Sequence, residues 1–280
     1  MKIAIIDGDS IGYSIGWVNK DKGPDDMMQI ILSVDEYMNR MIKKSGCTHI
    51  MGFLEGIQPN FRALSANVGQ VFETGMKQYK ESRQRDAGEG WYMKNFFLIT
   101  HRLRTKYGFK NVEFVESDDA VIIMANRMRE AGTDHVICSP DKDLKQFPGS
   151  HYDYAKDEMI EITEEEAEYN FWMQMVTGDT TDDVEGIPGL GPVKAKKFLN
   201  GVKPEYFKDN VLTLYQAAFG ERVGVLRYAM TFNYLRMLRE PAYHFDPSQY
   251  TPLPVHGLID PEETPEKVDV SEVFNNIKNE

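Results

Sequence analysis

Acidic residues are concentrated in five short segments of the 280-residue chain, where they could carry out metal-assisted chemistry. The segments read IIDGDS, GFLEG, ESDDA, SPDKDL and GDTTDD, and the acids of interest are Asp7, Asp9, Glu55, Glu116, Asp118, Asp119, Asp141, Asp143, Asp179 and Asp182. Carboxylates that lie close together raise one another's pKa, so a fold that gathers them needs cations to neutralise them. Oxygen ligands select hard ions such as Mg²⁺ or Mn²⁺ over zinc. Two such ions about 4 Å apart can activate a water and stabilise the leaving oxygen of a phosphodiester.

Each of these acids also has an ordinary structural explanation. Asp118 and Asp119 stand at the start of an expected helix, where acids complement the helix dipole. Asp179 and Asp182 are typical turn residues, and Glu55 could be a solvated side chain. Taken singly, each acid favours the structural explanation, whereas the joint placement of the five segments favours a shared metal site.

A common location for the five segments follows from an α/β fold with a mostly parallel central sheet flanked by helices. Apolar runs that end near acids predict strands over residues 2–6, 49–54, 112–115 and 135–138. Residues 30–42 have helical spacing, and residues 120–128 form an apolar helix after the third strand. Because the carboxyl ends of parallel strands face one crevice, acids that follow these strands should meet there.

The second half of the chain is predicted to be mainly helical. Residues 151–155 and 159–162 could pair as short strands, and residues 163–177 have the pattern of a capped helix with acids in its first turn. Helical patterns continue to about residue 240. The segment 241–280 is rich in proline and acids, which predicts an extended wrap or tail.

Basic residues are concentrated in two regions, although the formal net charge is -12. Residues 74–110 contain nine Lys or Arg and three acids, and a second group comprises Lys194, Lys196, Lys197 and Lys203. Residues 66–90 are polar, basic and longer than an ordinary connection, which suggests a functional or disordered segment. These regions could contact a polyanion even though the whole chain is acidic.

A glycine-rich motif, GIPGLGPVKAKKFL at residues 186–199, follows the last acidic segment. A turn of this kind opening into a helix directs backbone amides at an anion, so phosphate contact that is independent of sequence is expected. The motif also fits an ordinary tight turn with Pro192 as the first helical residue. Its position directly after GDTTDD makes the phosphate-binding interpretation more specific.

Several classes of protein are excluded by composition. Cys47 and Cys138 stand alone, which excludes a disulfide framework and a cysteine-based zinc site. No stretch approaches the roughly 18 apolar residues that a membrane span requires. We therefore expect a cytoplasmic protein without a membrane partner.

The chain resembles the 5' nucleases, meaning the flap endonucleases and 5'-3' exonucleases of bacteriophages and the matching domain of bacterial DNA polymerase I. The resemblance covers residues 2 to about 199, in which IIDGDS, ESDDA, CSPDKDLKQ and TGDTTDDVEGIPGLGPVKAKKFL match in order and spacing. FNYLRMLRE and the overall length are most similar to the phage exonucleases. The resemblance implies a PIN-like nuclease core over residues 1–175 with a basic helical arch at about 66–106. A DNA-binding region with a helix-three-turn-helix would follow at 176–240, and a tail at 241–280.

The resemblance also implies roles for individual residues. Asp7, Glu116 and Asp118 would hold a first metal ion, and a second would be held by Asp119, Asp141, Asp143 and Asp182 with Asp179 in support. The family usually has Asp where Glu55 stands, so a direct bond from Glu55 to metal is left open. The arch would supply Lys80 and Arg83 as a phosphate clamp, with Tyr79 placed to stack on a base and Lys77 beside them. Duplex phosphates, and K⁺ in some members, would bind at the helix-three-turn-helix, represented by Gly189, Gly191, Lys194 and Lys196.

The function implied by the family is hydrolysis of double-stranded or flapped DNA near 5' ends, with Mg²⁺ or Mn²⁺ as cofactor. A role in phage DNA replication or degradation, in the bacterial host cytoplasm and alongside replication proteins, would follow. The sequence leaves open the balance of exonuclease and flap endonuclease activity, the cleavage of RNA in RNA-DNA hybrids, the physiological metal and the oligomeric state.

Two other functions remain as alternatives. DGDS also resembles the DxDx start of haloacid dehalogenase-type phosphatases, in which Asp7 would be a nucleophile and Asp9 an acid or base. Such a phosphatase has no use for the basic segment or the glycine motif, so we expect Asp9 to be a structural acid in a first helical turn. The other alternative is a non-catalytic DNA-binding protein whose acids bind metal for stability, which predicts salt-sensitive duplex binding without cleavage.

Overall fold

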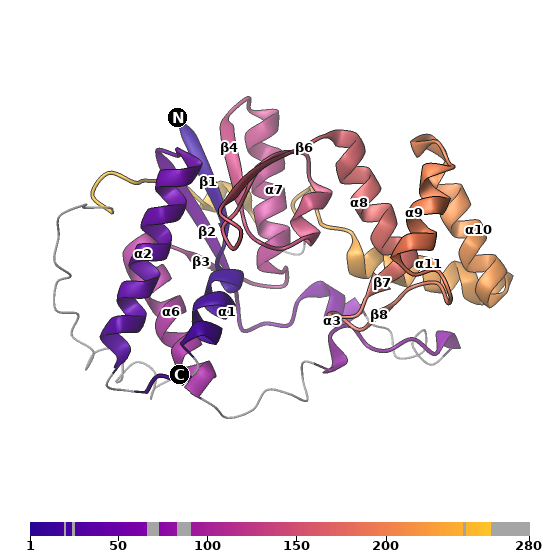
Figure 1. Cartoon of the computed structure of the whole chain (residues 1–280), viewed down its shortest axis with the longest axis horizontal. Coiled ribbons are helices and arrows are strands. Elements are labelled where there is room, and N and C mark those ends of the chain that lie inside the picture. Colours follow the sequence, from indigo (N-terminus) through magenta and orange to yellow (C-terminus); the bar gives the residue numbers. More distant parts are fainter. Residues whose placement is uncertain (20, 24–25, 66–72, 83–90, 243–244, 259–280) are drawn as a thin grey trace.

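A mostly parallel sheet flanked by helices forms the centre of the molecule (Figure 1). The computed structural model describes residues 1–19, 21–23, 26–65, 73–82, 91–242 and 245–258. Within these residues the sheet has seven strands in the order β3-β2-β1-β4-β5-β6, with β9 also paired to β2. Their bounds are β1 Lys2–Asp7, β2 His49–Glu55, β3 Lys110–Val112, β4 Asp134–Cys138, β5 Gly149–Asp153, β6 Glu158–Ile162 and β9 Leu253–Pro254. The pairs β5–β6 and β2–β9 are antiparallel and the others parallel, which confirms the predicted fold class.

Strand β1 is buried on both faces because helices cover each side of the sheet. Ala4 and Ile6 pack in one core with helices α1 (Gly8–Val18), α2 (Met27–Ser45) and α6 (Trp91–Tyr107). Ile3 and Ile5 point to the opposite face, where α7 (Ser117–Glu130) packs. The uninterrupted apolar run of β1 is typical of a parallel strand covered on both sides. Figure 1 shows α2 and α7 on different sides of the strands.

A third apolar cluster holds the helices of the C-terminal half together. Its buried side chains include Phe171, Val211, Tyr215 and Met230. The elements are α8 (Glu164–Thr177), β7 (Gly178–Asp179), β8 (Val184–Glu185), α9 (Pro192–Asn200), α10 (Phe207–Phe219) and α11 (Glu221–Leu235). Helix α8 begins with the expected cap, in which Thr163 and Glu166 form a capping box. The predicted domain boundaries at 175 and 240 stay a prediction.

The third strand begins two residues and ends three residues before its predicted bounds, since β3 covers Lys110–Val112 rather than 112–115. Phe114 has a positive φ of 64°, a conformation that ends an extended strand. Its carbonyl accepts a hydrogen bond from the Phe61 amide at 2.8 Å, which anchors the short helix α3 (Phe61–Ser65) beside the chain entering α7. The early end of β3 therefore creates room for α3 next to Glu116.

Part of the predicted tail is an extended wrap. Strand β9 lies against the first residues of β2, pairing at His49 and Ile50, and the ring of Phe245 stacks on Tyr250 near Phe53. The remainder of that segment, residues 259–280, lies outside the described residues, as do 66–72 and 83–90 of the predicted arch. Among the helices that are described, we find none both long and apolar enough to cross a bilayer.

Candidate metal centre

The acids predicted to meet come from neighbouring strand ends. Asp7 is the last residue of β1, Glu55 the last residue of β2, and Asp141 follows β4 by three residues. Strand β1 lies between β2 and β4 and runs parallel to both, so these three ends are adjacent. Glu116 caps the start of α7. The parallel sheet thus places acids that are more than 100 residues apart at one edge.

Asp7 is buried and surrounded by hydroxyl donors. Its Oδ1 accepts hydrogen bonds from the Asp9 amide and from Ser117 Oγ, both at 3.2 Å. Its Oδ2 accepts from Ser139 Oγ at 3.2 Å and from the hydroxyl of Ser10. Burial raises the pKa of Asp7, and the nearby Asp141 raises it further. The three serines come from α1, α7 and the end of β4. Each lies inside one of the acidic segments IIDGDS, ESDDA and SPDKDL, where the sequence analysis considered only the acids.

Three more aspartates share this environment. Burial raises the pKa of Asp118 well above its usual value, and the charges of Asp7 and Asp141 add to the shift. Burial together with Asp141 raises the pKa of Asp143 to about 7. The Asp143 amide donates to Asp141 Oδ1 at 2.8 Å, which sets the turn that holds both acids. The charge of Asp141 adds to the raised pKa of both Asp118 and Asp143, as expected for carboxylates that lie close together.

Glu116 has the opposite electrostatic environment. Burial alone would raise its pKa, but the positive charges of Arg62 and Lys80 lower it. Arg62 Nη1 donates to Glu116 Oε2 at 2.7 Å, and the ammonium of Lys80 contacts Oε1. Asn60 Nδ2 also donates to Oε1, at 3.1 Å. The cations beside Glu116 therefore favour its ionised form, whereas burial disfavours the ionised form of Asp7 and Asp118.

Asp119 lies in a different environment from the one predicted. It is fully buried, and its two oxygens accept hydrogen bonds from Nη1 and Nη2 of Arg62 at 2.5 and 2.9 Å. The Leu238 amide donates to Oδ1 at 2.9 Å as well. Since both oxygens face the guanidinium group, this arrangement does not support a contact of Asp119 with a metal ion. Arg62 itself carried no motif that would have identified it.

Tyr79 corrects a second prediction. Its ring is 4% exposed and stacks on Tyr234 with 5.3 Å between ring centroids, so it is covered rather than available to a DNA base. Its hydroxyl group donates to Glu116 Oε2 and to Asp182 Oδ2, each at 3.0 Å. The predicted base-stacking role of Tyr79 is wrong in this structure, where the residue connects two acids.

The segment around Lys80 is attached to the β7–β8 hairpin. The Lys80 amide donates to the Asp182 carbonyl at 3.0 Å, and the Ser82 amide donates to Asp183 Oδ2 at 2.8 Å. Lys77, more than half exposed, pairs with Asp183 at 3.3 Å. Lys80 therefore lies beside the acid cluster and Lys77 beside Asp183, whereas the expected partner of Lys80, Arg83, lies outside the described residues. Their contact with phosphate stays a prediction.

Asp179 and Asp182 both belong to this hairpin and are buried. Lys142 Nζ lies 2.8 Å from Asp179 Oδ2. Burial alone would raise the pKa of Asp179, but the bond from Lys142 and that from the Thr181 amide lower it. Asp179 also contributes to the raised pKa of Asp143, so the hairpin and the turn after β4 share one electrostatic environment.

Glu55 and Asp9 lie at the border of the cluster. Asp9 is in the first turn of α1, as expected, and its Oδ2 accepts the Glu55 amide at 2.8 Å. Burial and the charge of Asp7 raise the pKa of Asp9 to about 7. The Glu55 side chain is exposed and accepts a hydrogen bond from Asn60 Nδ2 at 3.1 Å. Asn60 is buried and also donates to Glu116 Oε1, so it connects the exposed Glu55 side chain to the cluster.

The predicted DNA-binding residues near residue 190 lie on the surface. Gly189 has a φ of 76°, which favours glycine in this turn, and Gly191 is the N-cap of α9. Pro192 is the first helical residue, and Lys194 and Lys196 are exposed on the helix. The amides at the start of α9 are thus presented beside basic side chains, as the motif predicted. Their contact with DNA stays a prediction.

The donor set fits hard divalent ions in chemistry and charge. The candidate ligands are all carboxylates, and Asp7, Asp118 and Asp143 have raised pKa values that a cation would relieve. In the described part of the chain, however, no three His, Cys, Asp or Glu side chains already form an arrangement that would hold a metal. Lys80 and Lys142 lie against Glu116 and Asp179 instead. The side chains would therefore have to reorient around an ion.

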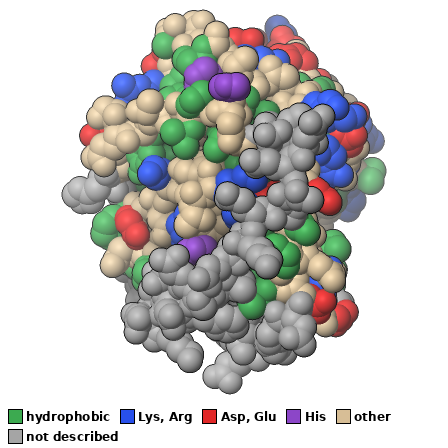
Figure 2. Space-filling model, turned by 90° about the vertical axis from the view of Figure 1, so that its left-hand side faces the viewer, with side chains coloured by type: hydrophobic (Ala, Val, Ile, Leu, Met, Phe, Trp, Pro, Cys, Tyr) green, Lys and Arg blue, Asp and Glu red, His purple; other side chains and the backbone are tan. Residues whose placement is uncertain are grey.

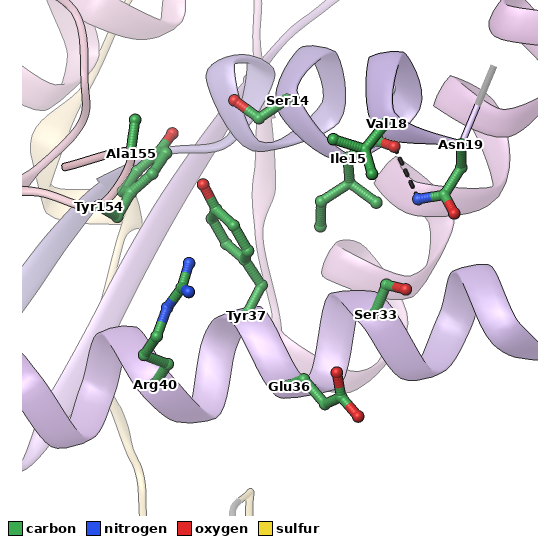
Figure 3. A pocket seen from close by; sticks show the side chains of 10 residues that line it. All are labelled: Ser14, Ile15, Val18, Asn19, Ser33, Glu36, Tyr37, Arg40, Tyr154 and Ala155. Carbon is green, nitrogen blue, oxygen red and sulfur yellow. Dashed lines mark hydrogen bonds between the residues drawn. The ribbon is translucent and has the colours of Figure 1, made fainter. Parts of the chain in front are cut away.

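Elsewhere a pocket of about 570 Å³ opens between α1 and α2 (Figure 3). Ser14, Tyr37, Arg40 and Tyr154 are among its lining residues. Tyr154 separates it from the cluster, since its hydroxyl contacts the Asp7 carbonyl at 3.4 Å. Figure 2 shows the face of the molecule that lies at the left in Figure 1, on the side of α2. Basic and acidic side chains are interspersed over the described part of this face.

Comparisons with known proteins confirm the resemblance to the 5' nucleases, although no family model matches the chain. DNA polymerase I of Rhizobium leguminosarum is 38% identical over 96 residues, which are 31% of this chain and 9% of the polymerase. DNA polymerase I of Bacillus caldotenax is 24% identical over 216 residues, 71% of this chain and 23% of that protein. Flap endonuclease Xni of Vibrio vulnificus is 21% identical over 243 residues, 81% of this chain and 89% of that enzyme. The chain thus spans about a quarter or less of the polymerases.

Solved structures with a similar fold include 5' nucleases of bacteriophage T5. The T5 5'-exonuclease with bound zinc superimposes with a TM-score of 0.57 at 13% identity, covering 85% of this chain and 99% of that one. The T5 flap endonuclease in a complex with DNA and metal ions gives 0.54 at 13% identity, covering 84% and 92%. These likenesses establish the fold.

Proposed function

We propose that this chain is a metal-dependent 5' nuclease that hydrolyses phosphodiesters near the 5' ends of double-stranded or flapped DNA. The observation that carries the proposal is the convergence of acids from separate strand ends beside the ammonium of Lys80, at the carboxyl edge of the sheet. The nuclease relatives and the T5 fold support it. A parallel sheet with a ligand site at this edge is the usual α/β arrangement.

In this proposal Asp7, Glu116 and Asp118 would hold one divalent ion, and Asp141, Asp143 and Asp182 a second, with Asp179 in support. Bound Mg²⁺ or Mn²⁺ would supply charge neutralisation and a water of lowered pKa. Asp119 is left out because Arg62 occupies both of its oxygens. The residues of this chain orient the ligands: the serine hydroxyls hold Asp7, and Arg62 holds Glu116.

Lys80 would position the scissile phosphate. Its ammonium already lies among the acids, and the bond from its amide to the Asp182 carbonyl fixes its backbone there. To contact a phosphate it would exchange one anionic partner, Glu116, for another. Such an exchange costs little electrostatic energy, because a charge-assisted bond is kept throughout. Arg83 would complete the clamp as the sequence predicts.

The start of α9 would hold the duplex away from the cleavage point. Exposed Lys194 and Lys196 lie beside the amides that follow Gly189 and Gly191. A helix N-terminus with adjacent lysines binds phosphates without reading sequence. A K⁺ ion, as the family resemblance implies, would bind at this same turn.

The test compares acids at the two ends of one strand. Asp141→Asn and Asp143→Asn, after β4, should each lower the rate of cleavage of 5'-labelled duplex or flap DNA with Mg²⁺ by about 100-fold or more. Asp134→Asn, at the exposed start of the same strand, is the matched control and should cleave normally. Full activity of either cluster variant would contradict the proposal.

The same preparation distinguishes the alternatives. A phosphatase would release phosphate from para-nitrophenyl phosphate and leave DNA intact, whereas a binding protein would shift duplex DNA with no products, with or without chelator. Flap, nicked, blunt and RNA-DNA substrates digested side by side, with the products sized, would define the balance of exonuclease and flap endonuclease activity.

A further inference from the structure

Arg62 is a fully buried arginine whose hydrogen-bonding capacity is used completely. Its Nε donates to the Tyr234 carbonyl at 3.0 Å, and Nη2 donates to the Arg236 carbonyl at 2.9 Å. The remaining donors serve Glu116 Oε2 and both oxygens of Asp119. A guanidinium group has five N–H groups in a planar fork, and here each has an acceptor.

These bonds join three segments that are distant in sequence. Arg62 lies in α3, its two acids lie at the start of α7, and its two carbonyl acceptors lie at the end of α11. The Tyr234 carbonyl is 172 residues from Arg62 along the chain. The guanidinium group therefore connects the end of α11 to the acids at the start of α7.

The two oxygens of Glu116 are separated by this arrangement. Oε2 accepts from Arg62 and from the Tyr79 hydroxyl, whereas Oε1 contacts the ammonium of Lys80 and accepts from Asn60. The two hydrogen bonds to Asp119 fix the plane of the guanidinium group. They therefore also fix the direction from which Arg62 donates to Glu116. A flexible lysine could supply the charge at this position but not the fixed orientation.

We infer that Arg62 is a positioning residue: it fixes the Glu116 carboxylate so that Oε1 faces the Lys80 ammonium beside the acid cluster, and it links that orientation to the end of α11. This inference rests on the proposed function, because it assigns Glu116 a role in holding a divalent ion. Arg62 touches neither substrate nor reacting atoms in it.

The experiment uses Arg62→Lys in the full chain, with Mn²⁺ alone as the probe in calorimetry and with flap DNA in single-turnover cleavage. We expect the Mn²⁺ dissociation constant to rise about tenfold and the single-turnover rate to fall about 100-fold, with DNA affinity within about threefold of the wild type. Arg236→Lys is the matched control, since its side chain pairs with Glu168 over the Phe171 ring. It should leave Mn²⁺ binding unchanged.

The same substitution made in a Glu116→Gln variant distinguishes a positioning role of Arg62 from a general contribution to the stability of the fold. In Glu116→Gln protein, the further change Arg62→Lys should have little additional effect on Mn²⁺ affinity, since Arg62 acts through Glu116. Equal effects in both backgrounds, or wild-type Mn²⁺ affinity in the single variant, would overturn the inference. A wild-type protein that binds Mn²⁺ without cutting DNA would refute the nuclease proposal and leave the Mn²⁺ comparison decisive for Arg62.

One measurement needs no variant and covers the case in which Arg62→Lys does not fold. Nitrogen NMR of the wild type should show separate, slowly exchanging Nη signals for Arg62, and they should shift at the Mg²⁺ concentration that shifts the Glu116 carboxyl carbon. Arg62 signals that stay unchanged at saturating Mg²⁺ would contradict the positioning role. Wild-type protein that shows no response to Mg²⁺ or Mn²⁺ would refute both proposals.

Discussion

The ammonium group of Lys80 forms an ion pair with Oε1 of Glu116, and the Lys80 backbone has a positive φ of 55°. A left-handed conformation is costly for lysine, so the surrounding contacts must hold it. The bonds from the Lys80 amide to Asp182 and from Tyr79 to Glu116 supply them. A cation from this segment thus occupies the oxygen that, in our proposal, would face a metal ion.

Replacing Lys80 should separate metal binding from catalysis. We expect Lys80→Ala to strengthen Mn²⁺ binding several-fold, because the competing ammonium is gone, and to slow single-turnover cleavage about 100-fold with a smaller effect on DNA binding. Lys77→Ala is the control, since exposed Lys77 pairs with Asp183 instead. Calorimetry with Mn²⁺ and quenched-flow cleavage would measure the two effects. An unchanged single-turnover rate would exclude a role for Lys80 in positioning phosphate.

Removing the Tyr79 hydroxyl should lower stability. Tyr79→Phe removes bonds to the buried acids Glu116 and Asp182, and we expect the free energy of unfolding to fall by about 1–3 kcal/mol. Tyr169→Phe, whose hydroxyl bonds Asn200 near the surface, should cost much less. Urea denaturation of the three proteins, in chelator, measures both. Equal losses in the two variants would show that the bridge between the acids is not stabilising.

The acid cluster should make stability depend on pH in an unusual direction. Asp9 and Asp143 have pKa values of about 7 in the folded chain, against 3.8 ordinarily. Between pH 4 and 7 the folded state therefore binds more protons than the unfolded state, so the free energy of unfolding falls as the pH rises through this window. Each group can lower the free energy of unfolding by at most about 4 kcal/mol over this window. We expect a total loss of about 2–4 kcal/mol, because Asp7 and Asp141, which add to the two raised pKa values, also interact with each other.

Urea denaturation at pH 5 and 7.5 in chelator would measure this loss. Asp143→Asn should flatten the dependence, because an amide does not titrate. Millimolar Mg²⁺ should restore stability at pH 7.5, by about 2.7 kcal/mol at 100 times its dissociation constant. Greater stability at pH 7.5 than at pH 5 without divalent ions would contradict the mutual repulsion of these acids.

Substitutions at the start of α9 should affect DNA binding in a salt-dependent way. Lys194→Ala should weaken duplex binding for any sequence and reduce the slope of log affinity against log salt by about 1. Stability should not change, because the side chain is exposed. Lys208→Ala, also exposed but in α10, is the control. Titrations at several salt concentrations measure the slope, and identical slopes for the two variants would remove α9 from the DNA-binding surface.

Local patterns in the sequence were sufficient for much of the fold. The apolar runs predicted β1, β2 and β4, the helical spacing predicted α2 and α7, and the Thr163 capping box predicted the start of α8. These predictions succeeded because they depend on periodicity and caps, which neighbouring residues determine. The convergence of the acids followed from strand direction, since parallel strands present the same ends at one edge. Strand β3 ends earlier than predicted because the turn at Phe114 is bonded to α3. No local sequence pattern indicates that contact.

The chain's sequence by itself determined the α/β architecture, the acids that meet and the basic residues beside them. Only the tertiary structure decided which atom faces which partner. It covers Tyr79 with Tyr234, gives both oxygens of Asp119 to Arg62, and surrounds Asp7 with serines from three elements. The physical reason is that a buried polar group must find partners wherever the fold brings them. For Arg62 those partners lie up to 174 residues away, beyond the reach of any spacing rule.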